Sequence, residues 1–391
     1  MKQLISIQQA EELITTHLPD LAQETVPLAE AHGRVLKEAI KADRPIPPYD
    51  RAMMDGIAIS YQSFADGVRD FPITGTQAAG QPALQLENAA HCIEVMTGAM
   101  TPKGSDCVIK VEDIDVKDNV ASLKPSCTAS LGQHIHPLGS DQQENSILVP
   151  DGSYLGSAEV AIAASVGQTE LSVIKQPRIL LITTGDEVIS PEEIPLQHQI
   201  RRSHSAAICG SIHNHRLGKI THTHVPDTAE ALEESLRDGL GKYDIILLTG
   251  GISMGKFDYV APVMESLVGS PLFHGIAQRP GKPFAFWPGS TPVFALPGNP
   301  VSVMACLARY ILPALRKMGG LQWQPQTLLL AKNTTWNAPF PGLVASHITK
   351  NQLHAAPPRN SGDYSALAGA QGICELPSTS PAGTPLRFYP W

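Results

Sequence analysis

The sequence predicts a multi-domain protein of mixed α/β and β structure, centred on a doubly wound parallel α/β domain. A chain of 391 residues exceeds what one compact core can organise, so about two to four domains are expected. Three continuous apolar runs, at 178–182, 243–248 and 293–296, alternate with helical patterns, as is typical of buried parallel strands. The 32 glycines and 33 prolines favour a loop-rich fold over a helical bundle.

The N-terminal part is expected to be helical. Ser6 and Gln9 have the spacing of a capping box, and apolar residues recur at helical spacing over 7–14. A second helix is predicted over 28–40, which carries the string LAEAHGRVL. The stretch Arg44–Pro48 holds three prolines and cannot continue a helix. We therefore assign residues 1–45 and 150–176 to an N-terminal helical and linker domain.

Residues 46–149 are predicted to form an inserted β-rich domain. The segment 107–112 is interpreted as a strand of alternating inward and outward residues. Asp118 and Asn119 supply a turn, and a second strand returns over 120–123.

Residues 177–320 are predicted to form the α/β domain. Its strands are expected at 178–182, 220–225, 243–248 and 293–296, with helices from about 203 and over 301–316. Asp227 with Glu230 has the pattern of a helix N-cap. The proline-rich segment 321–391 is predicted to be a small C-terminal β-domain.

Charge and cysteine content exclude several classes. The 29 basic and 37 acidic residues give a net charge of −8, which argues against a large nucleic-acid surface but leaves room for a local basic pocket. The six cysteines form no CxxC pair or His/Cys cluster, so buried thiols in a reducing cytoplasm are expected. The N-terminus lacks the apolar core of a signal peptide, and no uncharged apolar stretch could span a membrane. A cytoplasmic protein without membrane contact is expected.

The loops that follow the predicted strands carry the residues best suited to ligand binding and catalysis. TTGDEV (183–188) places two carboxylates behind a Thr-Gly turn, and GGISMGKFD (250–258) offers bare N–H groups. In the second loop, Ser253 and Asp258 suit a hydrated metal. LPGNPVS (296–302) opens a helix, whose N-terminus attracts anions, and RPGKP (279–283) precedes it with two cations. Together at one sheet edge, these loops predict a pocket for an anionic ligand with phosphate and metal character.

Other common sites are absent from the sequence. No GxxxxGK[ST] loop and no GxGxxG after a strand occur, so ordinary ATPase and dinucleotide-binding interpretations lose their main support. HExxH is absent too.

Seen as an ordered set, these strings resemble the MoeA family of molybdopterin molybdotransferases, which includes the gephyrin E-domain. LAEAHGRVL (28–36) is similar to the helix with which the family begins, and YDRAMMDGIAI (49–59) to its FDNSAMDGYA string. EVMTGAMTPKGSDCVIKVED (94–113) is similar to TGAPLPxGADAVV. TTGDE, GGxSxGxxD, RPGKP and LPGNPVS then follow in the family's order.

The resemblance implies insertion of molybdenum from molybdate into adenylylated molybdopterin, with release of AMP and a requirement for Mg²⁺. It also implies that the α/β domain is MogA-like. Molybdate is a dianion that needs cations and N–H donors, here Arg279, Lys282 and Ser302 at a helix start. Metal candidates by position are Asp186, Glu187, Asp227 and Asp258, and the catalytic candidates are Asp55, Glu187, Asp227 and Asp258. The implied substrate-binding residues are Thr97, Gly98, Thr184, Gly185, Gly250, Gly251, Ser253, Gly255, Pro297, Gly298 and Asn299.

The resemblance further implies a homodimer. The pterin is expected to span the sheet edge of one subunit and loops of the other subunit's β-rich domain, including Asp55 and Thr97. A transient contact with the molybdopterin adenylyltransferase that supplies the substrate is also implied.

The chain departs from the family's pattern in places. Arg51-Ala52-Met53 stands where the family reads Asn-Ser-Ala, and Ile57 replaces an aromatic residue. A region like NIRxxGxD reads HIHPLGSD at 134–141, so that His136 replaces an arginine. Arg202-Ser203-His204 replaces a DTN-like stretch. Extra arginines at 51, 201 and 202 suggest a rebuilt contact to substrate phosphate.

Several residues have a plainer interpretation. Asp227 fits a helix cap as well as a metal ligand, Asp55 a turn, and Glu187 a solvated surface acid. His134, His136 and His204 are interpreted as polar contacts, since their spacing does not suit a metal.

Three other functions are alternatives to molybdenum insertion. A MogA-like adenylyltransferase would carry GGTG where this chain has Gly250-Gly251-Ile252-Ser253, and would lack the β-domains. A non-catalytic molybdopterin-binding scaffold would be favoured by loss of the acids or of the PGNP loop, and both are intact. A tungstate-using paralogue cannot be separated from a molybdate-using one by sequence.

Overall fold

The computed structural model describes residues 4–252, 258–322, 325–358, 360 and 362–391. The chain divides into two compact units. The smaller unit comprises Pro27–His32 and Glu38–Leu171, and the larger unit comprises the residues up to Val26, Gly33–Lys37 and Ser172–Trp391. The four-domain division of the sequence stays a prediction. Among the described residues, no helix is both long and apolar enough to cross a membrane.

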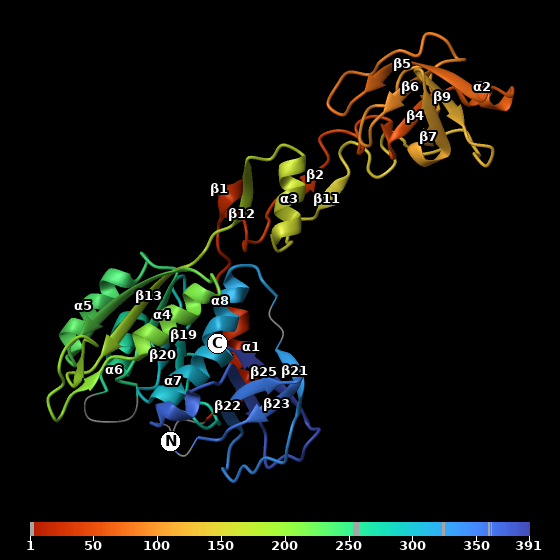
Figure 1. The fold of residues 1–391 in the computed structure, drawn as a ribbon. Coiled ribbons are helices and arrows are strands. Elements are labelled where there is room, and N and C mark those ends of the chain that lie inside the picture. Colours follow the sequence, from red (N-terminus) through yellow and green to blue (C-terminus); the bar gives the residue numbers. More distant parts are fainter. Residues whose placement is uncertain (1–3, 253–257, 323–324, 359, 361) are drawn as a thin grey trace. The chain divides into compact units, whose positions relative to one another are not determined.

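The smaller unit is built on a six-stranded sheet with the order β7-β4-β6-β5-β9-β8 (Figure 1). Its strands are β4 (Gly56–Ile59), β5 (Asp70–Gln77), β6 (Cys92–Val95), β7 (Cys107–Lys110), β8 (Ile114–Lys117) and β9 (Val120–Leu123). The predicted turn is confirmed, since Asp118 and Asn119 take φ of 50° and 60° between β8 and β9.

Short elements complete the smaller unit. They are β2 (Ile40–Lys41), β3 (Arg51–Ala52), α2 (Tyr61–Ala65), the 3-10 turns η1 (Leu28–Glu30) and η2 (Val111–Asp113), β10 (Ile135–His136), β11 (Ile147–Val149) and α3 (Ser157–Ser165). Strands β1 (Gln23–Pro27) and β12 (Glu170–Ile174) include the positions where the chain passes from one unit to the other.

Two predictions for this region are wrong. Residues 28–40 form no helix beyond the turn η1, because Gly33 adopts a φ of 86° and Lys37 N–H bonds to Ser172 O at 2.8 Å instead. The segment 107–112 does not alternate, since Cys107, Val108 and Ile109 are all buried before η2 begins. Both faces of β7 are covered, because Ile109 packs in the main core and Val108 packs against Ala52.

The larger unit contains the predicted doubly wound sheet, with the order β16-β13-β17-β20-β19-β18. Strands β16 (Lys219–Val225), β13 (Arg178–Thr184), β17 (Ile245–Thr249) and β20 (Val293–Leu296) are parallel. Sequence patterns missed β19 (Ala285–Trp287) and β18 (Phe273–His274), which extend the sheet in antiparallel fashion. A short parallel pair, β14 (Val188–Ile189) and β15 (Ile200–Arg201), lies beyond β13.

Helices cover both faces of this sheet (Figure 1). They are α1 (Ile7–His17), α4 (His204–Asn214), α5 (Ala229–Gly239), α6 (Val260–Val268), α7 (Pro300–Cys306), the π-helix η3 (Leu307–Ile311) and α8 (Leu312–Met318). The capping box of Ser6 and Gln9 is confirmed at the start of α1. The cap of α5 is Thr228, whose hydroxyl accepts from Ala231 N–H, so the prediction of an Asp227 cap is wrong by one residue.

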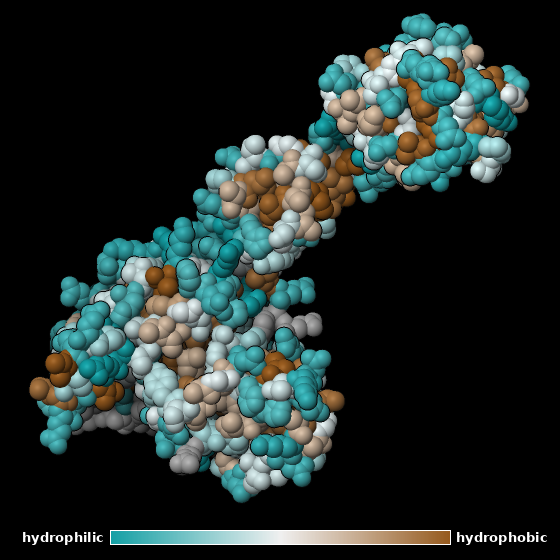
Figure 2. Space-filling view, viewed as in Figure 1, coloured by the Kyte–Doolittle hydropathy of each residue, from teal (hydrophilic) through white to brown (hydrophobic). Residues whose placement is uncertain are grey.

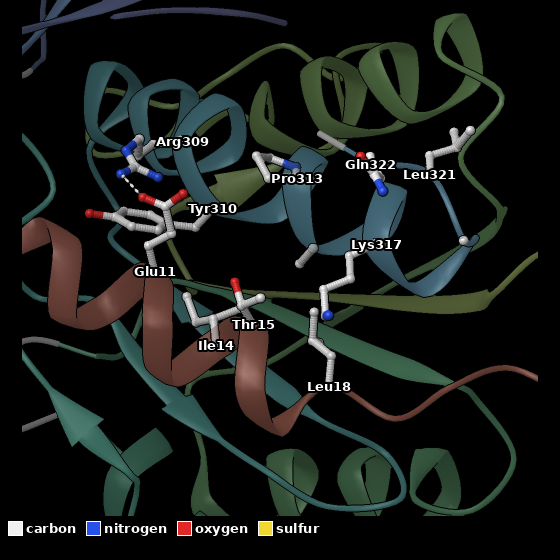
Figure 3. Close-up of a pocket in the computed structure, with 12 residues that line it drawn as sticks. Glu11, Ile14, Thr15, Leu18, Arg309, Tyr310, Pro313, Lys317, Leu321 and Gln322 are labelled. Carbon is white, nitrogen blue, oxygen red and sulfur yellow. Dashed lines mark hydrogen bonds and ion pairs between the residues drawn. The ribbon is translucent and has the colours of Figure 1, made fainter. Parts of the chain in front are cut away.

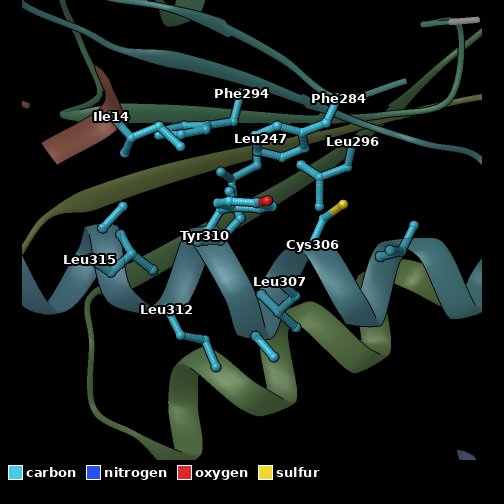
Figure 4. Packing of buried hydrophobic residues seen from close by; sticks show 14 of the residues in the cluster. Ile14, Leu247, Phe284, Phe294, Leu296, Cys306, Leu307, Tyr310, Leu312 and Leu315 are labelled. Atoms are coloured by element: carbon cyan, nitrogen blue, oxygen red, sulfur yellow. The ribbon is translucent and has the colours of Figure 1, made fainter. Parts of the chain in front are cut away.

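Side chains along the central strands point alternately to the two faces of the sheet, and each face has its own hydrophobic core. Ile179 and Leu181 of β13 pack with α1, α4 and α7–α8, whereas Leu180 and Ile182 pack with α5 and α6. In Figure 4, Tyr310 of η3 points toward the strands and lies 5.0 Å, centroid to centroid, from Phe284. Because both faces are buried, the strands read as continuous apolar runs.

The C-terminal residues of the larger unit close into a five-stranded barrel with the order β21-β23-β22-β24-β25. Its strands are β21 (Gln326–Leu330), β22 (Gly342–Thr349), β23 (Gln352–Ala355), β24 (Gly372–Leu376) and β25 (Pro385–Pro390), with a 3-10 turn η4 (Tyr364–Leu367) before β24. Residues Arg279 and Gly342 form a parallel bridge, which ties the loop before β19 to the barrel. All six cysteines of the chain are free thiols.

Candidate functional site

The parallel strands end in loops that lie together at the carboxyl edge of the sheet. Thr184 closes β13, and its hydroxyl donates to the carboxylate of Asp227, which follows the neighbouring strand β16. The main-chain N–H of Asp227 donates to Asp186 Oδ1 at 3.1 Å. Asp227 is therefore held at the sheet edge instead of capping α5.

Carboxylates gather around Asp227. Burial raises the pKa of Asp227, and the neighbouring carboxylates of Glu187 and Asp186 raise it further, while the Thr184 hydroxyl opposes this. Asp186 and Glu187 are exposed, and Asp258 is half-buried just before α6. Among the described residues, no three His, Cys, Asp or Glu side chains converge closely enough to hold a metal by themselves. The donor set suits a hydrated cation shared with substrate oxygens.

Two glycine loops approach each other beside these acids. Gly250 takes a φ of 94°, and a Cβ there would lie 2.8 Å from Thr184 Oγ1, so glycine is required. An ideal Cβ on Gly298 lies 3.9 Å from the Cα of Gly250, which places the loop after β20 against the loop after β17. Of the other predicted substrate-binding residues, Gly185, Gly251 and Pro297 lie in these strand-end loops, whereas Ser253 and Gly255 lie outside the described residues.

The predicted molybdate residues line one cavity. Arg279, Lys282 and Ser302 surround a space of about 590 Å³ together with Asn299, the N-cap of α7. Arg279 and Lys282 are exposed, whereas Ser302 is buried. The cavity therefore combines two cations with a helix start, which is the pattern that binds an oxyanion.

The barrel contributes to this cavity, a role that sequence reasoning missed. Trp336, Phe340 and Asn360 form part of the wall. Trp336 Nε1–H donates to Phe340 O at 2.8 Å and so closes the segment WNAPF into a turn. The concentration of aromatic residues and prolines at 336–341 is the signal that could have marked it.

Asp55 and Thr97 lie together in the smaller unit. Asp55 Oδ1 accepts from Thr97 N at 2.6 Å and from Thr97 Oγ1 at 2.8 Å. The N–H and then the hydroxyl of Thr97 hold the pKa of Asp55 below its usual value. Gly98, whose N–H donates to Ala52 O at 2.9 Å, continues the same loop. The side chains of Asp55 and Thr97 are exposed, so the ionised carboxylate of Asp55 is accessible to a ligand.

A histidine pair marks the outer strand of the larger sheet. The Thr183 hydroxyl lies 3.0 Å from His222 Nε2 and 2.9 Å from His224 Nδ1. A hydroxyl donates one proton only, so one imidazole accepts and the other donates. Burial lowers the pKa of both histidines, and the charge of Arg202 lowers it further. His222 and His224 therefore make polar contacts to Thr183 within the sheet. The sequence analysis, which did not consider these two, interpreted His134, His136 and His204 in the same way.

A second cavity in the larger unit, of about 420 Å³, holds none of the predicted site residues. It lies between α1 and the helix pair η3–α8 (Figure 3). The buried Arg309 pairs with Glu11, with Nη2 and Oε2 2.6 Å apart, and also with Glu375. Because this cation is paired with two carboxylates, its role is to join α1, η3 and the barrel.

Comparisons with known proteins point the same way. A model described as the MoeA N-terminal region (domain I and II) matches residues 5–167, and one described as a probable molybdopterin binding domain matches residues 180–317. A molybdopterin molybdenumtransferase of Synechocystis sp. is 35% identical over 396 residues, covering 99% of this chain and 100% of the relative. One of Synechococcus elongatus is 31% identical over 402 residues, covering 98% and 99%. The crystal structure of the molybdopterin biosynthesis MoeA protein from Pyrococcus horikoshii is 26% identical, with a TM-score of 0.82 and 100% of each chain covered.

Proposed function

Because this chain belongs to the molybdopterin molybdenumtransferase (MoeA) family, we propose that it inserts molybdenum from molybdate into adenylylated molybdopterin and releases AMP. The observation that carries the proposal is the meeting of Arg279, Lys282 and Ser302 in one cavity. Asn299, in the loop that approaches Gly250, links this cavity to the acid-bearing sheet edge. One continuous edge thus offers an oxyanion site beside a carboxylate cluster.

The molybdate site follows from charge and shape. A tetrahedral dianion in this cavity would meet the side chains of Arg279 and Lys282, the buried hydroxyl of Ser302 and the N-terminus of α7. Trp336 and Phe340 add an aromatic wall to one side of the cavity.

Magnesium is assigned to the acids at the sheet edge. Burial raises the pKa of Asp227, and the charges of Glu187 and Asp186 raise it further, so a cation there relieves an unfavourable charge. Asp258 is a further candidate ligand. When bound, Mg²⁺ neutralises phosphate oxygens and favours cleavage of the phosphoanhydride. Thr184 orients the Asp227 carboxylate through its hydroxyl.

A homodimer is part of the proposal. Helix α3 (SAEVAIAAS) has six apolar residues among its nine, and three of them, Ala158, Ala161 and Ala164, are exposed. Figure 2 shows hydrophobic side chains gathered over α3. Such a surface is typical of an interface. We assign it to a second copy of the chain, with Asp55 and Thr97 of one protomer contacting pterin bound at the sheet edge of the other. A transient contact with the adenylyltransferase would deliver the adenylylated substrate.

Single-turnover release of AMP tests the proposal. Native protein is mixed with adenylylated molybdopterin and magnesium, with and without molybdate, beside Asp227→Asn and a matched control. The control Asp238→Asn makes the same change on the exposed surface of α5, where Asp238 pairs only with Lys242 among the described residues. We expect molybdate-dependent release from native and control proteins and little from Asp227→Asn. Tight pterin binding without release from the native protein would instead favour a non-catalytic scaffold.

A further inference from the structure

Strand β3 of the smaller unit lies between two other segments. On one side it pairs with β10, where His136 is opposite Arg51 and Ile135 is opposite Ala52. On the other side Ala52 N donates to Ala99 O and Gly98 N donates to Ala52 O, both at 2.9 Å. The segments that carry Arg51, His136 and Thr97 are therefore adjacent in one small sheet.

Arg51, His136 and Asp141 form a connected chain of polar contacts. His136 Nε2 lies 2.8 Å from Asp141 Oδ1, and His136 Nδ1 lies 3.1 Å from Arg51 Nη2. A guanidinium can only donate, so Nδ1 must accept, and the ring proton resides on Nε2 and is donated to Asp141. The carboxylate thus fixes the tautomer of His136, and His136 in turn fixes the orientation of the guanidinium.

Most of the hydrogen-bonding capacity of Arg51 is left for another group. The guanidinium has five N–H donors, and the contact with His136 is the only hydrogen bond or ion pair that its side chain makes among the described residues. The side chain is exposed. An arginine that is oriented but uncompensated matches the bidentate geometry of a phosphate group.

The surroundings of Arg51 favour a ligand with an aromatic part. Met53, Met54 and Leu138, which lie within three residues of Arg51 or His136 along the chain, are 50%, 42% and 53% exposed and so offer apolar side chains to a ligand. The ionised Asp55, bonded to Thr97, adds an acceptor for ring N–H groups. Cation, acceptor and apolar surface together suit a flat heterocycle that carries phosphate.

We propose that Arg51 binds a phosphate group of the pterin substrate, and that His136 and Asp141 are positioning residues that act through Arg51. This inference rests on the proposed function, since it takes the phosphorylated pterin as the ligand. Asp55 and Thr97 then contact the ring while Arg51 contacts the phosphate. In this arrangement Arg51 supplies selectivity for the phosphorylated form.

The test compares binding of molybdopterin with binding of its dephosphorylated form to the full-length protein. Arg51→Met should weaken molybdopterin binding roughly 10- to 100-fold and leave the dephosphorylated pterin within about twofold of native. Arg51→Lys keeps the positive charge but loses the bidentate guanidinium. Its affinity for molybdopterin should lie between those of the native protein and Arg51→Met. Arg44→Met is the matched control, because Arg44 is an exposed arginine of the same unit paired only with Asp43 among the described residues.

The positioning role is tested by a double-mutant cycle. His136→Asn should weaken molybdopterin binding in the native background but add almost nothing in the Arg51→Met background. Additive losses would show that His136 acts independently and would overturn its assignment. If Arg51→Met lost both pterins equally, or neither, the phosphate assignment would be wrong while the proposed function stood. If the native protein bound neither of these pterins nor adenylylated molybdopterin, the proposed function itself would fail.

Discussion

The main-chain N–H of Asp227 donates to the carboxylate of Asp186 at 3.1 Å, so two acids from neighbouring parallel strands meet at one sheet edge. This contact joins the loops after β13 and β16. It also orients Asp227 toward Thr184 and away from the start of α5.

Asp227→Asn should stabilise the metal-free protein while abolishing AMP release. Burial and neighbouring carboxylates raise the pKa of Asp227, so its ionised form is unfavourable in the folded state. This gain in stability over the native protein should be present near neutral pH. It should disappear as the pH falls through the titration of the Asp227 carboxyl group. Thermal unfolding should show a rise in Tm of about 1–2 °C. A clear fall in Tm would show that the charge stabilises the fold.

Gly250→Ala should damage the sheet edge more than a comparable glycine change elsewhere. The added Cβ would lie 2.8 Å from Thr184 Oγ1 and displace the hydroxyl that holds Asp227. Gly241→Ala is the control, since Gly241 also has a left-handed φ of 80° but no atom within 4 Å of the added Cβ. Both variants should lose about 1 kcal/mol to backbone strain, and Gly250→Ala more than that. AMP release should persist only in the control.

Lys282→Met should weaken molybdate binding roughly 10- to 100-fold, because it removes a cation from the oxyanion cavity. Lys317→Met is the control, since Lys317 lines the other cavity of the larger unit. Equilibrium dialysis with molybdate measures both affinities. Equal losses of molybdate affinity in the two variants would mean that the overall charge of the protein causes the effect and that the cavity is not the molybdate site.

Acidification should destabilise the larger unit through its half-buried histidines. Burial lowers the pKa of His204, His215, His222 and His224 below the ordinary value of about 6.5. A histidine with a lowered folded pKa contributes fully above about pH 6.5, and this contribution is lost as pH falls through that value toward the folded pKa. The free energy of unfolding should therefore decline as the pH falls below about 6.5.

A substitution isolates this histidine contribution. His204→Asn should make the decline less steep, whereas His198→Asn at an exposed position should leave the slope unchanged. Unfolding by urea at a series of pH values provides the measurement. Parallel slopes for native protein and His204→Asn would contradict the burial argument.

The sequence predicted the strand-end loops well, because periodic burial and glycine are local signals. The runs at 178–182 and 293–296 coincide with β13 and β20, and their loops carry Thr184 and Asn299 to the same edge. Strands β18 and β19 escaped prediction because they are two and three residues long and pair only through tertiary contacts.

Contacts between distant segments could not be predicted. Trp336 reaches the cavity only because the barrel closes and the Arg279–Gly342 bridge ties it to the loop before β19. The pairing of Arg51 with His136 depends on the register of two-residue strands. The predicted helix at 28–40 does not form, because Gly33 takes a left-handed conformation within it.

The most direct test of the central claim is the ratio of molybdenum bound to the pterin to AMP released after one turnover of native protein. Insertion at this sheet edge predicts that the two products form together, about one to one, only when molybdate and magnesium are both present. Release of AMP without molybdate, or without molybdenum appearing on the pterin, would contradict the account and identify a hydrolase that acts on the adenylylated pterin alone.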